Sequence, residues 1–341
     1  MFATSEYKAR TARAQSMMAD RGIDALLLTT EPEVRYFTGY LTRFWESPAR
    51  PWFLVVPANG DPVAVIPTIG AALMGRSWIK DIRTWRSPDY DDDGVGLLAN
   101  TLRELGALNV AVPMGLETHL RMPLDDFDVL QEAIGSKIVS DGGIIPALRM
   151  IKSKAEVAAI QTACDVATRA FARVPEIAGA GVPLSTVFRK FQMLCLDEGA
   201  DFVPYLAGGA GSGGYDDVIS PASDAPLQDG DILMLDTGLT VNGYFCDFDR
   251  NFAVGSVTDV SQAAHRKLID AVNAAMDIAK PGITAAQLFH AMDDIVTGGA
   301  GGSDTGRLGH GLGMQLTEWP SLIPADKTVL AEGMVLTLEP G

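Results

Sequence analysis

One stretch of the chain, residues 232–254 (ILMLDTGLTVNGYFCDFDRNFAV), constrains the fold more than any other. Two runs rich in Leu, Val, Tyr and Phe flank Asn242-Gly243, which is a strong signal for a β-hairpin turn because both residues tolerate positive φ. A four-residue loop, 240–243, would place Asp236 opposite Asp247. A two-residue turn would place Asp236 opposite Asp249, with Asp247 diagonal to it. Either register sets two carboxylates about 5 Å apart, measured between Cβ atoms, on one face of the hairpin.

Carboxylates this close raise each other's pKa and destabilise the fold unless a positive charge lies between them. A bound divalent cation is the simplest source of that charge. The alternative is a solvated hairpin with acidic decoration, and the apolar flanking positions argue against it. The hairpin therefore predicts a metal site that contains Asp236.

Length and composition limit the other possibilities. A chain of 341 residues predicts two domains, and 47% hydrophobic with 21% charged residues is typical of a globular soluble protein. No apolar run approaches the length of about 18 residues that a membrane span needs, and the N-terminus lacks a signal-peptide core. The net charge of −16 argues against nucleic acid and anionic membrane as partners. Three cysteines without metal-site spacing predict a reducing, cytoplasmic location.

The order of predicted elements indicates two domains. Alternating strands and helices up to residue 142 predict an α/β domain. Beyond it we expect helices at 149–172, 184–198, 261–279 and 285–296, with the hairpin between the second and third and a final strand pair at 329–338. The glycine-rich segment 204–214 has no Lys-Ser/Thr after it and opens no helix, so it is no phosphate-binding loop. We expect it to be a mobile segment that lines a cleft.

Several motifs in this order resemble one known family. They are LDTG at Asp236, YFCDFDR at Asp247, LGHGLG around His310 and LTLEPG at Glu339, and the two aspartates are 247 − 236 = 11 residues apart. Together with GIDALLLTTEPEVRYFTGY and LRMIKSKAEVAAIQTA, they resemble the metallopeptidase family that contains methionine aminopeptidase, aminopeptidase P, prolidase and creatinase. The resemblance implies a creatinase N-like α/β domain, residues 1–142, followed by an α+β pita-bread catalytic domain, residues 143–341.

The resemblance also implies a chemistry. Asp236, Asp247, His310 and Glu339 would hold one or two divalent ions of Mn, Co, Zn or Fe, and Glu339 would also handle the proton of a nucleophilic water. Carboxylates with one imidazole suit such ions, and two ions sharing a water would lower its pKa and polarise a scissile carbonyl. The implied reaction is cleavage of a C–N bond in an X-Pro-type peptide or a similar small substrate.

The sequence departs from the family pattern in three places. The second bridging Glu of the family lies beyond Glu339, and this sequence ends at Gly341, so we expect either a catalytic domain that is incomplete at its C-terminal end or an incomplete dinuclear site that could still hold one ion. Thr317 and the segment 215–219 stand where the peptidases carry two substrate-binding histidines. Losing both imidazoles would cost about 10²–10³ in rate unless other donors replace them, and Tyr215 and Thr317 could donate instead.

These departures leave two other functions open. One is a non-peptidase enzyme of the same family: a creatinase-like or ectoine-hydrolase-like hydrolase of amidines or amides, or a lyase acting on a small betaine or sulfonium compound. The other is a non-catalytic pita-bread binding module, which the four retained ligands disfavour.

Two further residues follow from the resemblance. Arg50 stands where creatinase places an arginine that reaches the active site of the partner subunit, so we expect a homodimer in which Arg50 binds a substrate carboxylate. Asp249 stands where relatives usually have a threonine, and we expect it to adjust the metal ligands from outside the coordination sphere rather than to act as a third metal ligand.

Overall fold

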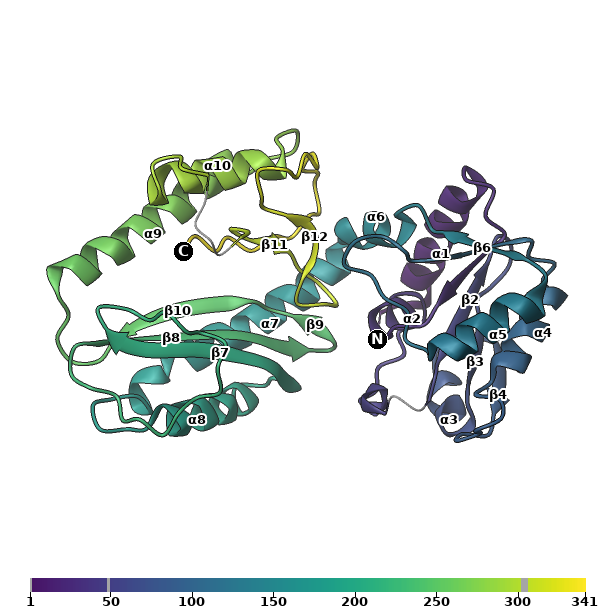
Figure 1. Ribbon diagram of the computed structural model, residues 1–341, viewed down its shortest axis with the longest axis horizontal. Coiled ribbons are helices and arrows are strands. Elements are labelled where there is room, and N and C mark those ends of the chain that lie inside the picture. The colour runs from purple at the N-terminus through teal and green to yellow at the C-terminus, as the bar shows by residue number, and fades with distance from the viewer. Residues whose placement is uncertain (1, 48–49, 302–305) are drawn as a thin grey trace. The chain divides into compact units, whose positions relative to one another are not determined.

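The computed structural model describes residues 2–47, 50–301 and 306–341, and it divides into two compact units, Met1–Arg149 and Met150–Gly341 (Figure 1). This division leaves α6 (Ile144–Met150) almost entirely in the first unit, whereas our expected domain boundary after residue 142 assigns it to the second. The boundary at which the two domains separate stays a prediction.

The first unit is built on a six-stranded mixed sheet in the order β4-β3-β2-β1-β5-β6. The strands are β1 (Ala25–Leu28), β2 (Phe53–Pro57), β3 (Val63–Pro67), β4 (Asp81–Trp85), β5 (Asn109–Val112) and β6 (Lys137–Ser140). The helices are α1 (Thr4–Ala19), α2 (Glu31–Thr38), α3 (Ala71–Met74), α4 (Val95–Glu104), α5 (Leu124–Ile134) and α6. One apolar core joins α4 and α5 to the central strands, as expected for an α/β domain. β4 and β6 contain exposed residues, so neither strand appears in the sequence as a run of apolar residues.

The second unit carries the hairpin in a sheet of order β10-β8-β7, with β9 also paired to β8. The strands are β7 (Phe202–Ser212), β8 (Asp231–Val241), β9 (Tyr244–Phe245) and β10 (Phe248–Ala253). Asn242 has φ 52° and Gly243 has φ 79°, so the turn has two residues. Asp236 therefore pairs with Asp249, and the register with a four-residue loop is wrong.

The glycine-rich segment 204–214 is mostly strand rather than the mobile loop that we expected. β7 pairs antiparallel with β8 along most of its length. Glycine suits this position because a Cβ on Gly208 would collide with the carbonyl oxygen of Met234 on the neighbouring strand. The segment is therefore a structural part of the sheet that bears Asp236.

Helices and short strands complete the second unit. The helices are α7 (Lys154–Ala172), α8 (Leu184–Asp197), α9 (Asp259–Ile278) and α10 (Ala285–Val296), and the short strands are β11 (His310–Gly311) and β12 (Glu318–Ser321). In Figure 1, α7 and α8 lie against the β7-β8-β10 sheet, and α9 and α10 lie beside β11, β12 and the C-terminal segment. The predicted strand pair at 329–338 is wrong: this segment makes only isolated bridges, Val329 with Thr284 and Leu336 with Gly311. No helix of the described residues is long and apolar enough to cross a membrane.

Candidate metal centre

The alternation of β8 places Asp236 on the face of the sheet away from the core. Leu233, Leu235 and Leu239 point into the apolar core formed with α7 and α8. Asp236 lies between them in sequence and therefore faces the other way. There its Oδ2 atom accepts a hydrogen bond of 3.0 Å from the hydroxyl of Tyr205 on β7. The hairpin thus displays Asp236 on an open face and fixes one of its two carboxylate oxygens.

Three other residues from separate segments meet beside it. Asp247 lies in the short break between β9 and β10, His310 begins β11, and Glu339 lies near the C-terminal end of the sequence. One ligand atom from each lies within 4.8 Å of the others. His310 Nε2 lies 3.3 Å from Asp247 Oδ2 and 3.3 Å from Glu339 Oε1.

The ring of His310 is oriented for coordination. Its Nδ1 atom lies 2.8 Å from the carbonyl oxygen of Gly311. A carbonyl oxygen can only accept, so Nδ1 carries a proton and the neutral ring presents the lone pair of Nε2 to the two carboxylates. This is the tautomer that a metal-binding histidine needs.

The glycines beside His310 allow its segment to lie close to its neighbours. Gly309 has φ 137°, and a Cβ there would collide with the carbonyl oxygen of Thr337. The backbone N–H of His310 donates to the Thr337 hydroxyl at 2.9 Å, and the Thr337 N–H donates to the His310 carbonyl at 2.8 Å. The GHG motif therefore lets the C-terminal segment pack directly against β11, and this packing brings Glu339 to the site.

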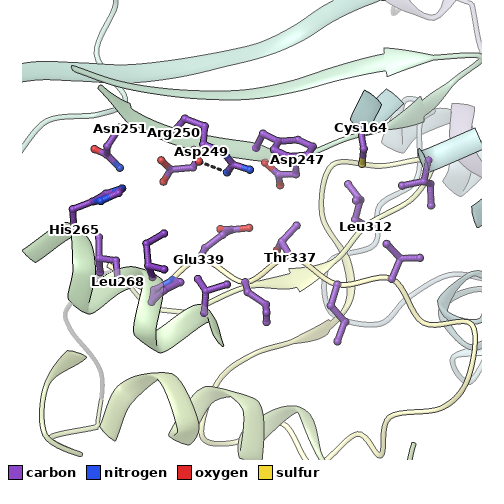
Figure 2. A pocket seen from close by; sticks show the side chains of 18 residues that line it. Cys164, Asp247, Asp249, Arg250, Asn251, His265, Leu268, Leu312, Thr337 and Glu339 are labelled. Atoms are coloured by element: carbon purple, nitrogen blue, oxygen red, sulfur yellow. Dashed lines mark hydrogen bonds between the residues drawn. The ribbon is translucent and has the colours of Figure 1, made fainter. Parts of the chain in front are cut away.

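Asp247, Asp249 and Glu339 line a cavity of about 550 Å³. Figure 2 shows Asp247 and Asp249 facing Glu339 across it. Its other walls are mainly apolar and include Ile160 and Cys164 of α7. A cavity of this size admits a small molecule or a short peptide.

The electrostatics of the cluster favour a bound cation. Burial and then the charge of Asp247 raise the pKa of Asp236 to about 7. Removal of water by the surrounding protein atoms, together with the charge of Glu339, raises the pKa of Asp249 to about 6, although the residue remains exposed to the cavity. Burial acts to lower the pKa of His310, but its contact with Asp247 and the charge of Glu339 raise it overall.

The described part of the chain supplies no permanent positive charge to this cluster by direct contact. Within it, no lysine or arginine forms an ion pair with Asp236, Asp247, Asp249 or Glu339. Glu339 Oε1 is buried and has no hydrogen-bond partner. Carboxylate oxygens and one imidazole with a free lone pair are the donor set of a divalent transition-metal site, so these residues fit such an ion.

The three residues predicted to bind substrate are Thr317, Tyr215 and Arg50. Thr317 lies in the loop before β12, where its hydroxyl is 3.4 Å from Nη2 of Arg307. The hydroxyl of Tyr215 donates to Asn251 Oδ1 at 2.6 Å, and burial raises the pKa of Tyr215 to about 12. Arg50 belongs to the first unit, where its guanidinium lies 4.8 Å from the ring centroid of Phe44, and its neighbours at 48–49 lie outside the described residues.

The search for ligands in the sequence missed Tyr205 and Arg307. Tyr205 was hidden because the segment that carries it was interpreted as a loop. Its position two residues before Ala207, the partner of Asp236, becomes informative only once the β7–β8 register is known. Arg307 precedes the GHG motif by two residues, and only the fold shows that it reaches Thr317.

Comparison with known proteins identifies the family. The family model for the creatinase/prolidase N-terminal domain matches residues 10–151, and that for metallopeptidase family M24 matches residues 158–341. The probable dipeptidase PepE of Mycobacterium tuberculosis is 30% identical over this entire chain and 88% of its own length. An Xaa-Pro dipeptidase of Pyrococcus furiosus is 35% identical over 58% of this chain and 57% of its own length.

Solved structures agree with the sequence comparison. The crystal structure of dipeptidase PepE from Mycobacterium ulcerans superposes with a TM-score of 0.82 at 29% identity, covering 99% of this chain and 89% of that one. The predicted combination of a creatinase N-like domain with a pita-bread catalytic domain is thereby confirmed. The chain therefore belongs to metallopeptidase family M24 and is a metallohydrolase of that family.

Proposed function

We propose that this metallohydrolase cleaves the C–N bond of a short X-Pro-type peptide with a water molecule activated at Asp236, Asp247, His310 and Glu339. The observation that carries the proposal is the meeting of Asp247, His310 and Glu339 within 4.8 Å, beside Asp236, with no ion pair from a lysine or arginine of the described chain. The dipeptidase and Xaa-Pro dipeptidase relatives support a peptide substrate over an amidine hydrolase or a small-molecule lyase.

The chain's own residues have distinct tasks in this reaction. Bound divalent ions would lower the pKa of water and polarise the scissile carbonyl. His310 Nε2 and the carboxylates of Asp236, Asp247 and Glu339 would hold the ions. Glu339 accepts the proton of the attacking water and returns it to the leaving nitrogen, a role that its unbonded Oε1 atom leaves open.

In this proposal the substrate is bound by hydrogen-bond donors other than imidazole. Thr317, in contact with Arg307, and Tyr215, held by Asn251, stand at the positions of the two missing histidines. Leu316 packs over Gly238, two residues beyond Asp236 on the same face of β8, so the loop that carries Thr317 lies on the metal-bearing face of the hairpin. The Thr317 hydroxyl and the Arg307 guanidinium can donate to a peptide carbonyl, and Tyr215 can do so once its hydroxyl releases Asn251, which preserves part of the stabilisation that the imidazoles would give.

Assembly and location complete the proposal. A homodimer would let Arg50 of one subunit bind the substrate carboxylate at the active site of the other, bidentately. The three free cysteines, Cys164, Cys195 and Cys246, suit a reducing cytoplasm. Among candidate ions we propose Mn, Co, Zn or Fe, in one or two positions.

The test begins with protein stripped of metal by a chelator and reloaded separately with Mn²⁺, Co²⁺, Zn²⁺ or Fe²⁺. Each form is assayed with Gly-Pro and Ala-Pro-Pro and with a panel of creatine, ectoine and betaines. We expect metal-dependent release of amino acid from the proline peptides alone. Turnover of a panel compound without peptide cleavage would replace the peptidase proposal, and failure to bind any ion would remove the metal mechanism.

A further inference from the structure

The observed hairpin register changes the role expected of Asp249. We propose that Asp249 is an additional metal ligand of this centre, an inference that rests on the metal site proposed above. Asp249 is the direct cross-strand partner of Asp236, and it lines the same cavity as Asp247 and Glu339. Directly paired residues have Cβ atoms about 5 Å apart, so both carboxylates can reach one ion.

The immediate neighbours of Asp249 leave its carboxylate available. Nη1 of Arg250 donates to the backbone carbonyl of Asp249 and not to its side chain (Figure 2). Among the residues that the structure describes, none forms a hydrogen bond or ion pair with the Asp249 carboxylate. By contrast, Asn251, the next residue on this face of β10, is held by the Tyr215 hydroxyl.

Charge and coordination both favour this assignment. Asp236, Asp247, Asp249 and Glu339 together carry four negative charges when ionised, which two divalent ions would neutralise. Tyr205 donates to Oδ2 of Asp236 and so uses one lone pair of that oxygen. An oxygen from Asp249 would raise the coordination number, which favours Mn²⁺ with its preference for octahedral oxygen-rich sites over Zn²⁺ with its preference for four ligands.

Relatives that usually carry threonine here offer the natural comparison. A threonine hydroxyl is neutral and a poorer ligand, so a site with threonine would hold its ions with one carboxylate fewer. The aspartate would therefore make this chain more selective for Mn²⁺ over Zn²⁺ than the same protein with threonine. A change in the preference between Mn²⁺ and Zn²⁺ would show that Asp249 coordinates the ion, because a charge that only attracts from a distance acts equally on both divalent ions.

The experiment measures the affinity of the metal-free protein for Mn²⁺ and for Zn²⁺ by competition with a chromophoric chelator. The variants are Asp249→Asn, Asp249→Thr and Asp249→Glu, with Asn251→Thr as the matched control on the same strand face. We expect Asp249→Asn and Asp249→Thr to lose about 10–100-fold in Mn²⁺ affinity, with a clearly smaller loss for Zn²⁺. Asp249→Glu should restore part of the Mn²⁺ affinity, and the control should keep the parental ratio.

Cobalt provides a second readout that does not depend on activity. The visible absorption of Co²⁺ in the parent should intensify in Asp249→Asn, because lower coordination numbers absorb more strongly. An equal loss for Mn²⁺ and Zn²⁺, or no loss with an unchanged Co²⁺ spectrum, would overturn the proposal. Complete loss of Mn²⁺ binding in Asp249→Asn, with Zn²⁺ binding retained, the circular dichroism of the parent and recovery in Asp249→Glu, would support it. A parent that binds no ion would instead refute the metal centre itself.

Discussion

Two groups of carboxylates in the second unit differ in how the fold compensates their charge. Glu318 is buried with Lys152: Nζ and Oε2 are 3.1 Å apart, and the side chains are 2% and 6% exposed. Asp236, Asp247, Asp249 and Glu339 lie together, and no lysine within the described residues forms such an ion pair with them. The first arrangement is complete within the chain, whereas the second fits the bound cation that we propose. The comparison shows how the partners of an acidic side chain help to assign it to structure or to function.

The largest expected difference between the two groups comes from neutralising Asp236. Asp236→Asn should lower kcat/KM by at least about 10³-fold, equivalent to about 4 kcal/mol of transition-state stabilisation, because an ion ligand is lost. In the metal-free protein the same change removes like-charge repulsion and should raise the Tm by at least about 2 °C. Steady-state kinetics and a thermal melt in chelator test both effects. Retained activity, or a lower Tm without metal, would place Asp236 with the structural carboxylates.

Replacing Lys152 should have the opposite effect on stability, because it should destabilise the protein. Lys152→Met leaves a buried Glu318 without its charge partner and should destabilise the second unit by about 3–5 kcal/mol. The double variant Lys152→Met/Glu318→Gln removes both charges and should recover much of that loss. Chemical denaturation measures each free energy of unfolding. If the double variant is no more stable than the single one, the loss comes from packing around Lys152 and not from an uncompensated charge.

The sequence predicts these two groups unequally. The spacing of Asp236 and Asp247 and the GHG motif at His310 indicate the metal ligands, because such ligands lie in short, chemically distinctive segments. Lys152 and Glu318 are 166 residues apart and join only through tertiary packing, so no local pattern reveals them. The family resemblance therefore predicts a metal site, which stays a prediction, whereas no pattern in the sequence indicates the Lys152–Glu318 ion pair.

The errors in the predicted fold have a similar origin. Glycine is uncommon in strands, so the pattern in 204–214 favours a loop, yet pairing with β8 overrides this preference. The two hairpin registers differ by two residues at every cross-strand pair, and the choice depends on whether the turn includes Thr240 and Val241, which the sequence leaves open and the positive φ of Asn242 and Gly243 decides. That decision determines which residue faces Asp236, and hence the role of Asp249.

A smaller effect should appear when pH is varied. In the metal-free fold, Asp236 has a pKa of about 7 and Asp249 of about 6, above the ordinary value of 3.8. The folded state thus binds more protons than the unfolded state between about pH 4 and 7, so these groups make the metal-free protein less stable as pH rises through that range. Metal must displace the same protons, so its apparent affinity should rise by up to about tenfold per pH unit per proton below pH 7.

Calorimetric titration at pH 5.5, 6.5 and 7.5, combined with melts at each pH, checks this prediction. Added metal should stabilise the protein most at pH 7.5. Asp236→Asn, which lacks the group with the higher pKa, should show a flatter stability profile without metal. A metal affinity independent of pH would mean that the carboxylates are already ionised in the empty site, and that their charges are compensated within the chain after all.

The smallest effect is expected at Tyr205, for which Tyr244 provides a matched control. The hydroxyl of Tyr205 donates to Asp236 at 3.0 Å, and that of Tyr244 donates at 3.2 Å, in a buried contact, to Glu156, which is not one of the proposed metal ligands. Removing the partner of a metal ligand typically lowers metal affinity about tenfold or more, so Tyr205→Phe should weaken Mn²⁺ binding by about that factor. Tyr244→Phe should lower the Tm and leave Mn²⁺ affinity unchanged. If both variants lose stability alone, Tyr205 supports the sheet and not the ligand, and the orientation of Asp236 is then fixed by the strand that carries it.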